Sequence, residues 1–127
     1  MKYLLDTHVI VWMVEDSSNL PLKIREIIRK PENQIAICSI SLWEIAIKMN
    51  IGKLTLSLEF DELVDVLRSS DFDFLQVEDE YVSGLSKLPL LHKDPFDRLI
   101  ISTALTEKMT LITTDENIQK YDVPWTW

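Results

Sequence analysis

The sequence is short of the residues and runs that build membrane spans, disulfide networks and low-complexity chains. Its 127 residues include one cysteine, two glycines and five prolines. The lone Cys38 forms no internal disulfide, which is typical of a reducing, intracellular setting, and so little glycine and proline excludes fibrous and disordered classes. The first apolar stretch is broken at residues 6–8 and continues only over residues 9–14, far short of the roughly 20 residues of a membrane span. We therefore expect a cytoplasmic protein with no signal peptide and no membrane contact.

The length and composition of the chain predict one globular domain over residues 1–127. Hydrophobic residues make up 46% of the chain, which is enough to bury a single core. The net charge of −8 is concentrated in residues 59–80, which hold nine of the 21 acids and one of the 13 bases. In the rest of the chain the numbers of acidic and basic residues are equal. The acidic segment therefore predicts one solvated face and leaves other surfaces open to an anionic ligand such as nucleic acid.

Strand-like and helix-like segments alternate along the chain. We expect strands at residues 2–5, 34–38, 72–77, 110–113 and 123–127. Helices are expected at 9–15, 19–29, 39–50, 61–68, 78–87 (interrupted by Gly84) and 94–108, with a short one at 116–121. Because parallel strands joined by right-handed crossovers place helices on both faces, this order predicts an α/β fold: a three-layer α/β/α sandwich with a central, mostly parallel sheet.

Two acids lie just past the ends of expected strands, where ligands bind in such sheets. Asp6 comes after residues 2–5 and is surrounded by Leu4, Leu5, Val9 and Ile10, so its carboxylate is expected to be buried. Asp115 holds the equivalent place after the strand at 110–113. The structural alternative for each is the cap of the next helix, since aspartate commonly accepts hydrogen bonds from a helix N-terminus.

Two further acids lie on helices. Glu44 forms with Ser41 and Lys48 a narrow polar stripe on a helix that is otherwise apolar, which favours a stripe facing a cleft over an exposed ion pair. Asp97 comes three residues after Asp94, which already suits the helix cap, so a second acid is not needed for the helix dipole.

Gathered at one end of a parallel sheet, these four acids would repel one another unless a cation held them together. Mg²⁺ or Mn²⁺ prefers carboxylate oxygens, whereas Zn²⁺ takes histidine or cysteine, and the chain has only Cys38, His8 and His92. A carboxylate-bound metal suits hydrolysis of a phosphodiester by an activated water.

Four segments in this order resemble the PIN domain, and most closely the VapC-type toxins of prokaryotic type II toxin–antitoxin systems. They are LLDTHVIVW, SLWEIAIKMNIGKL, KDPFDRLIISTAL and LITTDENIQKY. The resemblance implies an Mg²⁺- or Mn²⁺-dependent endoribonuclease that cleaves RNA, forms a homodimer and is inhibited by an antitoxin. It also implies that Asp6, Glu44 and Asp97 hold the metal, and that Asp115 assists a second ion or orients the attacking water.

Several other residues carry weaker expectations. Lys48, Lys93 and Arg98 are candidates for contacts to RNA phosphates, with a solvated charge as the alternative. Thr7 and Thr114 are candidates for bonds to metal-bound waters, with bonds to the backbone as the alternative. We expect His8, Trp12 and Trp43 to pack in the core rather than to act on substrate.

Two other functions fit parts of the pattern. A receiver-type phospho-acceptor also clusters acids around Mg²⁺, but it needs an acid next to Asp6 and a lysine after the final strand, and both are missing. A catalytically silent module that only binds a partner is the second alternative, and the complete set of acids disfavours it.

Overall fold

A five-stranded sheet forms the centre of the computed structural model, which describes residues 1–127. The strands are β1 (Lys2–Leu5), β2 (Gln34–Cys38), β3 (Asp73–Leu75), β4 (Thr110–Ile112) and β5 (Trp125–Thr126). They lie in the order β3-β2-β1-β4-β5, and every neighbouring pair is parallel. The predicted mostly parallel sheet is therefore confirmed, and it is parallel throughout.

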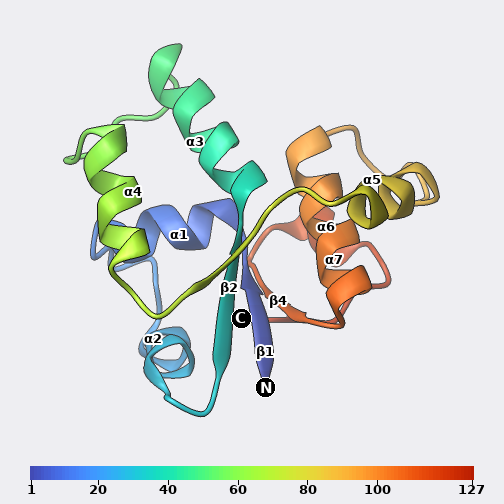
Figure 1. Ribbon diagram of the computed structural model, residues 1–127, viewed down its shortest axis with the longest axis horizontal. Helices are drawn as coiled ribbons and strands as arrows, with labels where there is room; N and C mark the ends of the chain where they lie inside the picture. The colour runs from blue at the N-terminus through green and yellow to red at the C-terminus, as the bar shows by residue number, and fades with distance from the viewer.

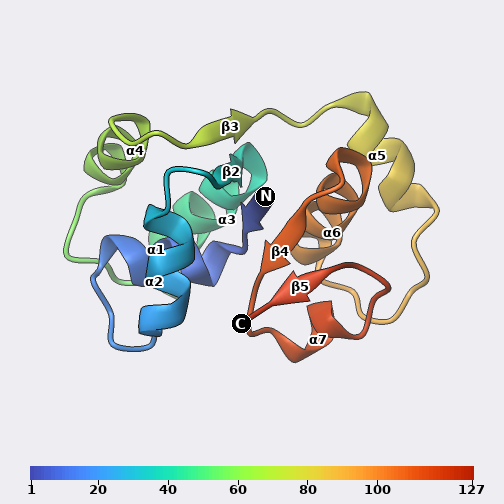
Figure 2. The same ribbon diagram turned by 90° about the horizontal axis from the view of Figure 1, so that it is seen from below.

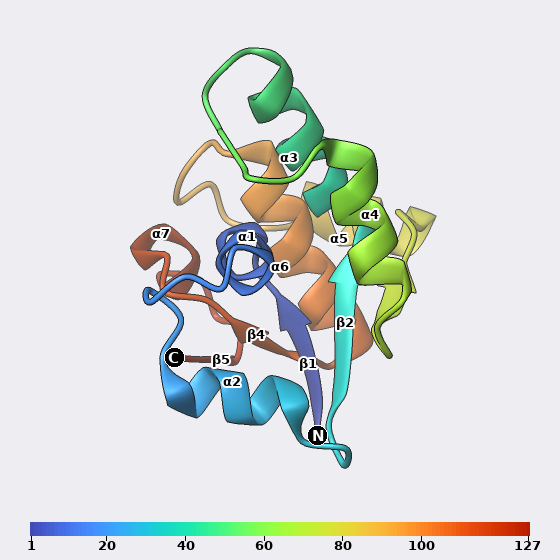
Figure 3. The same cartoon turned by 90° about the vertical axis from the view of Figure 1, so that its left-hand side faces the viewer.

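Seven helices complete the three layers. Four precede β3 in the chain: α1 (Thr7–Val14), α2 (Leu22–Arg29), α3 (Ser39–Asn50) and α4 (Phe60–Arg68). The others are α5 (Asp79–Ser86), α6 (Pro95–Glu107) and α7 (Glu116–Gln119). Helices α1, α2 and α4 lie on one side of the sheet and α5, α6 and α7 on the other, while α3 runs on past the end of β2 (Figures 1 and 3). No helix combines the length and the apolar content needed to cross a bilayer.

The strands separate two apolar cores because successive side chains of a strand point to opposite faces. Leu4, Ala36 and Leu111 belong to the core under α5 and α6. Their neighbours Leu5 and Ile37 belong to the other core, together with residues of α1, α2, α3 and α4. Both faces of the sheet are therefore covered, which explains why its strands are almost uniformly apolar.

The chain reverses direction across the sheet between β1 and β4. It first moves outward from β1 to β2 and β3, and then returns through α5 and α6 to place β4 on the other side of β1, next to β5 (Figure 2). In open parallel sheets, ligands bind at the carboxyl ends of the strands at this point of reversal. Leu5 of β1 pairs with Ile112 of β4, so Asp6 and Thr113 follow side by side.

The predicted elements are all present, with differences at their ends. Helix α1 begins at Thr7 rather than at residue 9, because Asp6 caps it by accepting a hydrogen bond from the Thr7 backbone N–H. The third strand is limited to Asp73–Leu75. Gly84 does not interrupt α5, which is continuous over Asp79–Ser86.

Candidate active site

Asp6 is held rigidly at the end of β1. Its Oδ1 accepts a hydrogen bond of 2.7 Å from the Thr7 backbone N–H, and its Oδ2 accepts one of 2.8 Å from the Thr113 hydroxyl. The residue is 2% exposed. Asp6 therefore has both of the roles proposed for it from the sequence: it caps α1, and it is a buried carboxylate at the point where the sheet reverses.

Thr113 is a site residue that the sequence analysis missed. It is fully buried, its hydroxyl donates to Asp6, and the same hydroxyl accepts a 3.0 Å hydrogen bond from the Asp115 backbone N–H. The pairing of β1 with β4 was the signal that could have found it, because that register places Thr113 opposite Asp6. Thr113 thus ties Asp6 to the loop that carries Asp115.

Asp115 caps the short helix α7. Its Oδ1 accepts hydrogen bonds from the backbone N–H groups of Asn117 and Ile118, at 2.8 and 3.2 Å. The capping alternative is therefore correct for Asp115. It leaves the second carboxylate oxygen without a hydrogen bond.

Helix α3 buries two polar residues and exposes two large apolar ones, although its Ile40 and Ile45 are buried. Ser41 and Glu44 are 0% and 2% exposed, whereas Trp43 is 64% and Ile47 44% exposed. The predicted polar stripe does face inward, but the expectation that Trp43 packs in the core is wrong. The reason is that residues 41 and 44 point toward α1 and α6, with Thr7 donating a 2.9 Å hydrogen bond to Ser41, so that residue 43 points outward.

The Glu44 carboxylate is only half satisfied. Its Oε2 lies 2.5 Å from Lys48 Nζ, and its Oε1 is buried without a hydrogen-bond partner. Although partial burial opposes it, the hydrogen bond and charge of Glu44 raise the pKa of Lys48. A buried carboxylate oxygen without a donor is costly and favours an additional cation at this place.

Asp97 lies in the first turn of α6, where Asp94 accepts hydrogen bonds from the backbone N–H groups of Phe96 and Asp97 and so caps the helix as predicted. Asp97 Oδ2 lies 3.1 Å from His92 Nε2. Ile100, Ile101 and Ala104 on the same helix are fully buried.

The four acids influence one another electrostatically. Burial, followed by the charges of Asp94, Asp6, Asp115 and Glu44 in that order, raises the pKa of Asp97 to about 8. Burial also raises the pKa of Asp6 to about 6, against the opposing effects of the Thr113 hydrogen bond and the His8 charge. Burial and the neighbouring carboxylates therefore disfavour the ionised forms of Asp6 and Asp97 in the absence of a cation.

In this structure the four carboxylates do not surround a common metal position. No three histidine, cysteine, aspartate or glutamate side chains lie close enough to hold one ion together. The oxygens available to coordinate an ion suit Mg²⁺ or Mn²⁺, because they belong to carboxylates and one of them, Oε1 of Glu44, has no hydrogen-bond partner. The assignment of a metal to these four residues stays a prediction.

The three cationic side chains proposed to contact phosphate differ in whether they are already bound to other groups of the protein. Lys93 is exposed and makes no hydrogen bond or ion pair. Arg98 donates from Nη1 to the Pro89 carbonyl at 2.8 Å and to the Tyr121 hydroxyl at 2.9 Å. Lys48 is bound to Glu44. Of the three, only Lys93 is available without breaking a contact.

The structure also shows the surroundings of His8, Trp12 and the two candidate threonines. The expectation that His8 is packed is wrong, because its ring is exposed on α1 and lies 6.0 Å from the ring of the half-buried Trp12. The first turn of α1 directs Val9 and Ile10 into the core and leaves His8 outside. Thr7 donates to Ser41, and Thr114 is exposed.

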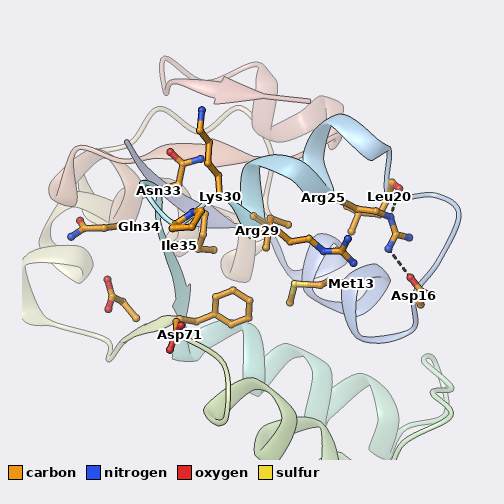
Figure 4. Close-up of a pocket in the computed structure, with 14 residues that line it drawn as sticks. Met13, Asp16, Leu20, Arg25, Arg29, Lys30, Asn33, Gln34, Ile35 and Asp71 are labelled. Carbon is orange, nitrogen blue, oxygen red and sulfur yellow. Dashed lines mark hydrogen bonds and ion pairs between the residues drawn. The ribbon is translucent and has the colours of Figure 1, made fainter.

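The two main pockets lie elsewhere. One of about 810 Å³ lies at the amino end of β2 and β3, with Met13, Leu20, Ile35 and Arg29 among its lining residues and the Arg25–Asp16 ion pair at its edge (Figure 4). The other, about 330 Å³, is formed by apolar residues of α3 and by Phe60. None of the four acids lines either pocket.

Comparison with known proteins gives relatives of the fold. No match was found among curated protein sequences. In structure the chain is similar to VapBC2 from Rickettsia felis bound to a promoter DNA fragment, at 21% identity over 100% of this chain and 99% of that chain, with a TM-score of 0.77. It is also similar to VapBC-5 of the VapBC family of toxin–antitoxin systems from Mycobacterium tuberculosis, at 18% identity over 95% and 90% of the two chains, with a TM-score of 0.63.

A more distant likeness is to the PIN domain endonuclease Utp24, at 12% identity over 94% of this chain and 74% of that chain, with a TM-score of 0.54. At these identities the likeness concerns the fold. The family model described as "PIN domain" matches residues 3–124, which is nearly the whole sequence. The chain therefore belongs to the PIN domain family.

Proposed function

We propose that this PIN domain is an Mg²⁺- or Mn²⁺-dependent endoribonuclease that acts in the cytoplasm as the toxin of a toxin–antitoxin pair. The observation that supports it most directly is the convergence of negative charge on Asp97 from Asp6, Asp115 and Glu44, at the point where the sheet reverses. Buried carboxylates of this kind need a cation, and a hard divalent ion is the one that oxygen ligands prefer.

Asp6, Glu44 and Asp97 are the residues that we propose to hold the ion, with Asp115 assisting. When bound, Mg²⁺ or Mn²⁺ supplies a polarised water and neutralises charge on the phosphate. The Thr7 backbone and the Thr113 hydroxyl keep Asp6 in one orientation. The unpaired Oε1 of Glu44 is free to coordinate the ion, whereas Oε2 accepts a hydrogen bond from Lys48 that a bound ion would weaken.

The lysines would act on the substrate. Lys93 is exposed next to Asp94, and we propose that it contacts a phosphate of the RNA. Lys48 would do so once a metal ion takes over the neutralisation of Glu44. Arg98 is engaged with Pro89 and Tyr121, so we assign it a structural role first.

An RNA cleavage assay tests this function. Purified protein is incubated with structured RNA and Mg²⁺, and the reaction is repeated with EDTA and with the Asp6→Asn variant. The control is Asp122→Asn, which replaces an exposed aspartate that makes no hydrogen bond. We expect cleavage by the wild type and the control, and loss of cleavage of about 10²-fold or more in Asp6→Asn and in EDTA. Intact RNA in every reaction would favour the silent binding module.

The receiver alternative does not agree with the topology. Receiver domains have the strand order 2-1-3-4-5, whereas here β1 lies between β2 and β4 in the order β3-β2-β1-β4-β5. The matching chemical test is incubation of the protein with a small phosphodonor, and we expect no transfer of phosphate to the protein.

We propose two protein partners, an antitoxin and a second copy of the chain. Structures of VapBC complexes are among the similar structures, which supports the antitoxin. Sedimentation of the purified chain alone distinguishes monomer from homodimer. Adding the protein encoded next to its gene tests for the antitoxin, and inhibition of RNA cleavage on mixing is the expected result.

A further inference from the structure

A chain of four polar side chains ends on Asp97. Arg98 Nη1 donates to the Tyr121 hydroxyl at 2.9 Å, and the same hydroxyl lies 2.8 Å from His92 Nδ1. His92 Nε2 in turn lies 3.1 Å from Asp97 Oδ2. Tyr121 is buried and its ring packs edge-on against the His92 ring, at 5.4 Å between centroids. Two members of the network, Tyr121 and Asp97, are buried, and the other two, His92 and Arg98, are half-buried.

Counting donors and acceptors fixes the direction of every bond in this network. A tyrosine hydroxyl has two acceptor sites and one proton to donate. Two N–H groups already donate to the Tyr121 oxygen, from Arg98 and from the His92 backbone at 3.2 Å. Its own proton must then go to an acceptor, and His92 Nδ1 at 2.8 Å is nearer than the His92 carbonyl at 3.5 Å.

The tautomer of His92 follows from this count. If Nδ1 accepts a hydrogen bond, the ring proton is on Nε2, and Nε2–H donates to Asp97 Oδ2. One oxygen of Asp97 is thereby fixed. The other, Oδ1, makes no hydrogen bond and is left for another ligand.

From this geometry we infer that His92 is a positioning residue for Asp97, kept in the Nε2–H form by Tyr121, so that Asp97 binds a divalent ion through Oδ1. The inference rests on the proposed metal-dependent function and adds two residues to it that are not acids. In metal sites, partners that hold a ligand in place typically change metal affinity 10–100-fold when they are removed.

The experiment measures binding of Mn²⁺ to the metal-free protein by calorimetry, without RNA. His92→Phe keeps a ring but removes the donor to Asp97, and we expect the dissociation constant to rise about 10–100-fold. In His92→Gln the side-chain amide can replace Nε2–H, so affinity should return to within about 5-fold of wild type. Circular dichroism checks that each variant is folded, and if His92→Phe does not fold, Tyr121→Phe takes its place with the same direction of effect.

Nitrogen NMR of the His92 ring in the metal-free protein gives a second readout. We expect an unprotonated Nδ1 and a protonated Nε2, and a loss of this preference in Tyr121→Phe. A ring protonated on Nδ1 in the wild type, or Mn²⁺ affinity unchanged in folded His92→Phe, overturns the role of His92. Absence of Mn²⁺ binding in the wild type is a different result, because it overturns the metal dependence of the proposed function and the role of Asp97 with it.

Discussion

Lys48 Nζ lies 2.5 Å from Glu44 Oε2, one turn along α3, and it is the one hydrogen-bond partner of the buried Glu44 carboxylate. The two side chains differ in their surroundings, since that of Glu44 is 2% exposed and that of Lys48 is 35% exposed. Lys48 is therefore an internal counterion that reaches the carboxylate from the solvent side. A metal ion bound by Glu44 would compete with it.

Replacing Lys48 by glutamine should destabilise the metal-free protein more than the metal-bound protein. Without Lys48, Glu44 is a buried charge with no cation, which we expect to cost about 1–2 kcal/mol in the free energy of unfolding. With saturating Mg²⁺ the loss should shrink, because the ion neutralises Glu44 instead. Urea denaturation in EDTA and in Mg²⁺ measures both values.

The matched control for that variant is Lys53→Gln, which removes an exposed lysine without a hydrogen bond or ion pair. It should leave the free energy of unfolding unchanged within about 0.5 kcal/mol in both conditions. An equal loss of stability in Lys48→Gln with and without Mg²⁺ would show that Glu44 does not exchange Lys48 for the ion.

The raised pKa values of Asp97 and Asp6 predict how the metal-free protein responds to pH. Both groups have an ordinary pKa of 3.8, and in the folded protein the pKa is about 8 for Asp97 and about 6 for Asp6. Between these values the folded state holds protons that the unfolded chain has released. The stabilisation is therefore complete below about pH 4 and is lost as the pH rises through 6 and 8.

In EDTA we expect the free energy of unfolding to fall by about 5 kcal/mol between pH 5 and pH 8.5, mostly because of Asp97. Asp97→Asn cannot ionise and should remove the larger part of this decline, so that the variant is more stable than the wild type at pH 8.5. Mg²⁺ favours the ionised carboxylates and should flatten the curve of the wild type. An Asp97→Asn variant with the same pH dependence as the wild type would contradict the assignment.

The sequence predicted the layers, the parallel sheet and the position of each acid because these depend on local signals. Apolar runs ending in Asp6 and Asp115 mark strand ends, and Asp94 before Pro95 marks the start of α6. Contacts between distant segments had no such signal. The Thr113 bond to Asp6 spans 107 positions, and it depends on the pairing of β1 with β4.

The apolar residues of α3 show a second limit. Hydrophobic side chains are normally assigned to the core, but this helix buries the polar Ser41 and Glu44 and exposes Trp43. Composition alone cannot tell which side of an almost entirely apolar helix turns inward. Packing against α1 and α6 decides it.

This orientation of α3 predicts opposite outcomes for two neighbouring hydrophobic substitutions. Ile45 is fully buried, and Ile45→Ala should cost about 2–4 kcal/mol in the free energy of unfolding. Trp43→Ser removes the larger side chain but from the surface, so we expect a change within about 0.5 kcal/mol. Urea denaturation of the two variants checks the ranking, and a larger loss for Trp43→Ser would mean that α3 is rotated relative to the present structure.

The close approach of α5 to α6 depends on Gly84. A Cβ at this position would lie 2.4 Å from Ser102 Oγ, and that hydroxyl is itself committed to a 2.6 Å hydrogen bond to the Tyr81 carbonyl. Alanine favours a helix over glycine by about 1 kcal/mol, but here the overlap should dominate. We expect Gly84→Ala to lower the free energy of unfolding by about 1–3 kcal/mol.

The double variant Gly84→Ala/Ser102→Ala separates this overlap from any general effect on α5. Ser102→Ala alone should cost about 1 kcal/mol, since it removes the hydrogen bond to Tyr81. In the double variant the Oγ atom is gone, so alanine at position 84 should no longer be costly and should add its helix preference. The double variant is then more stable than Gly84→Ala, and a simple sum of the two single losses in urea denaturation would exclude the contact as the cause.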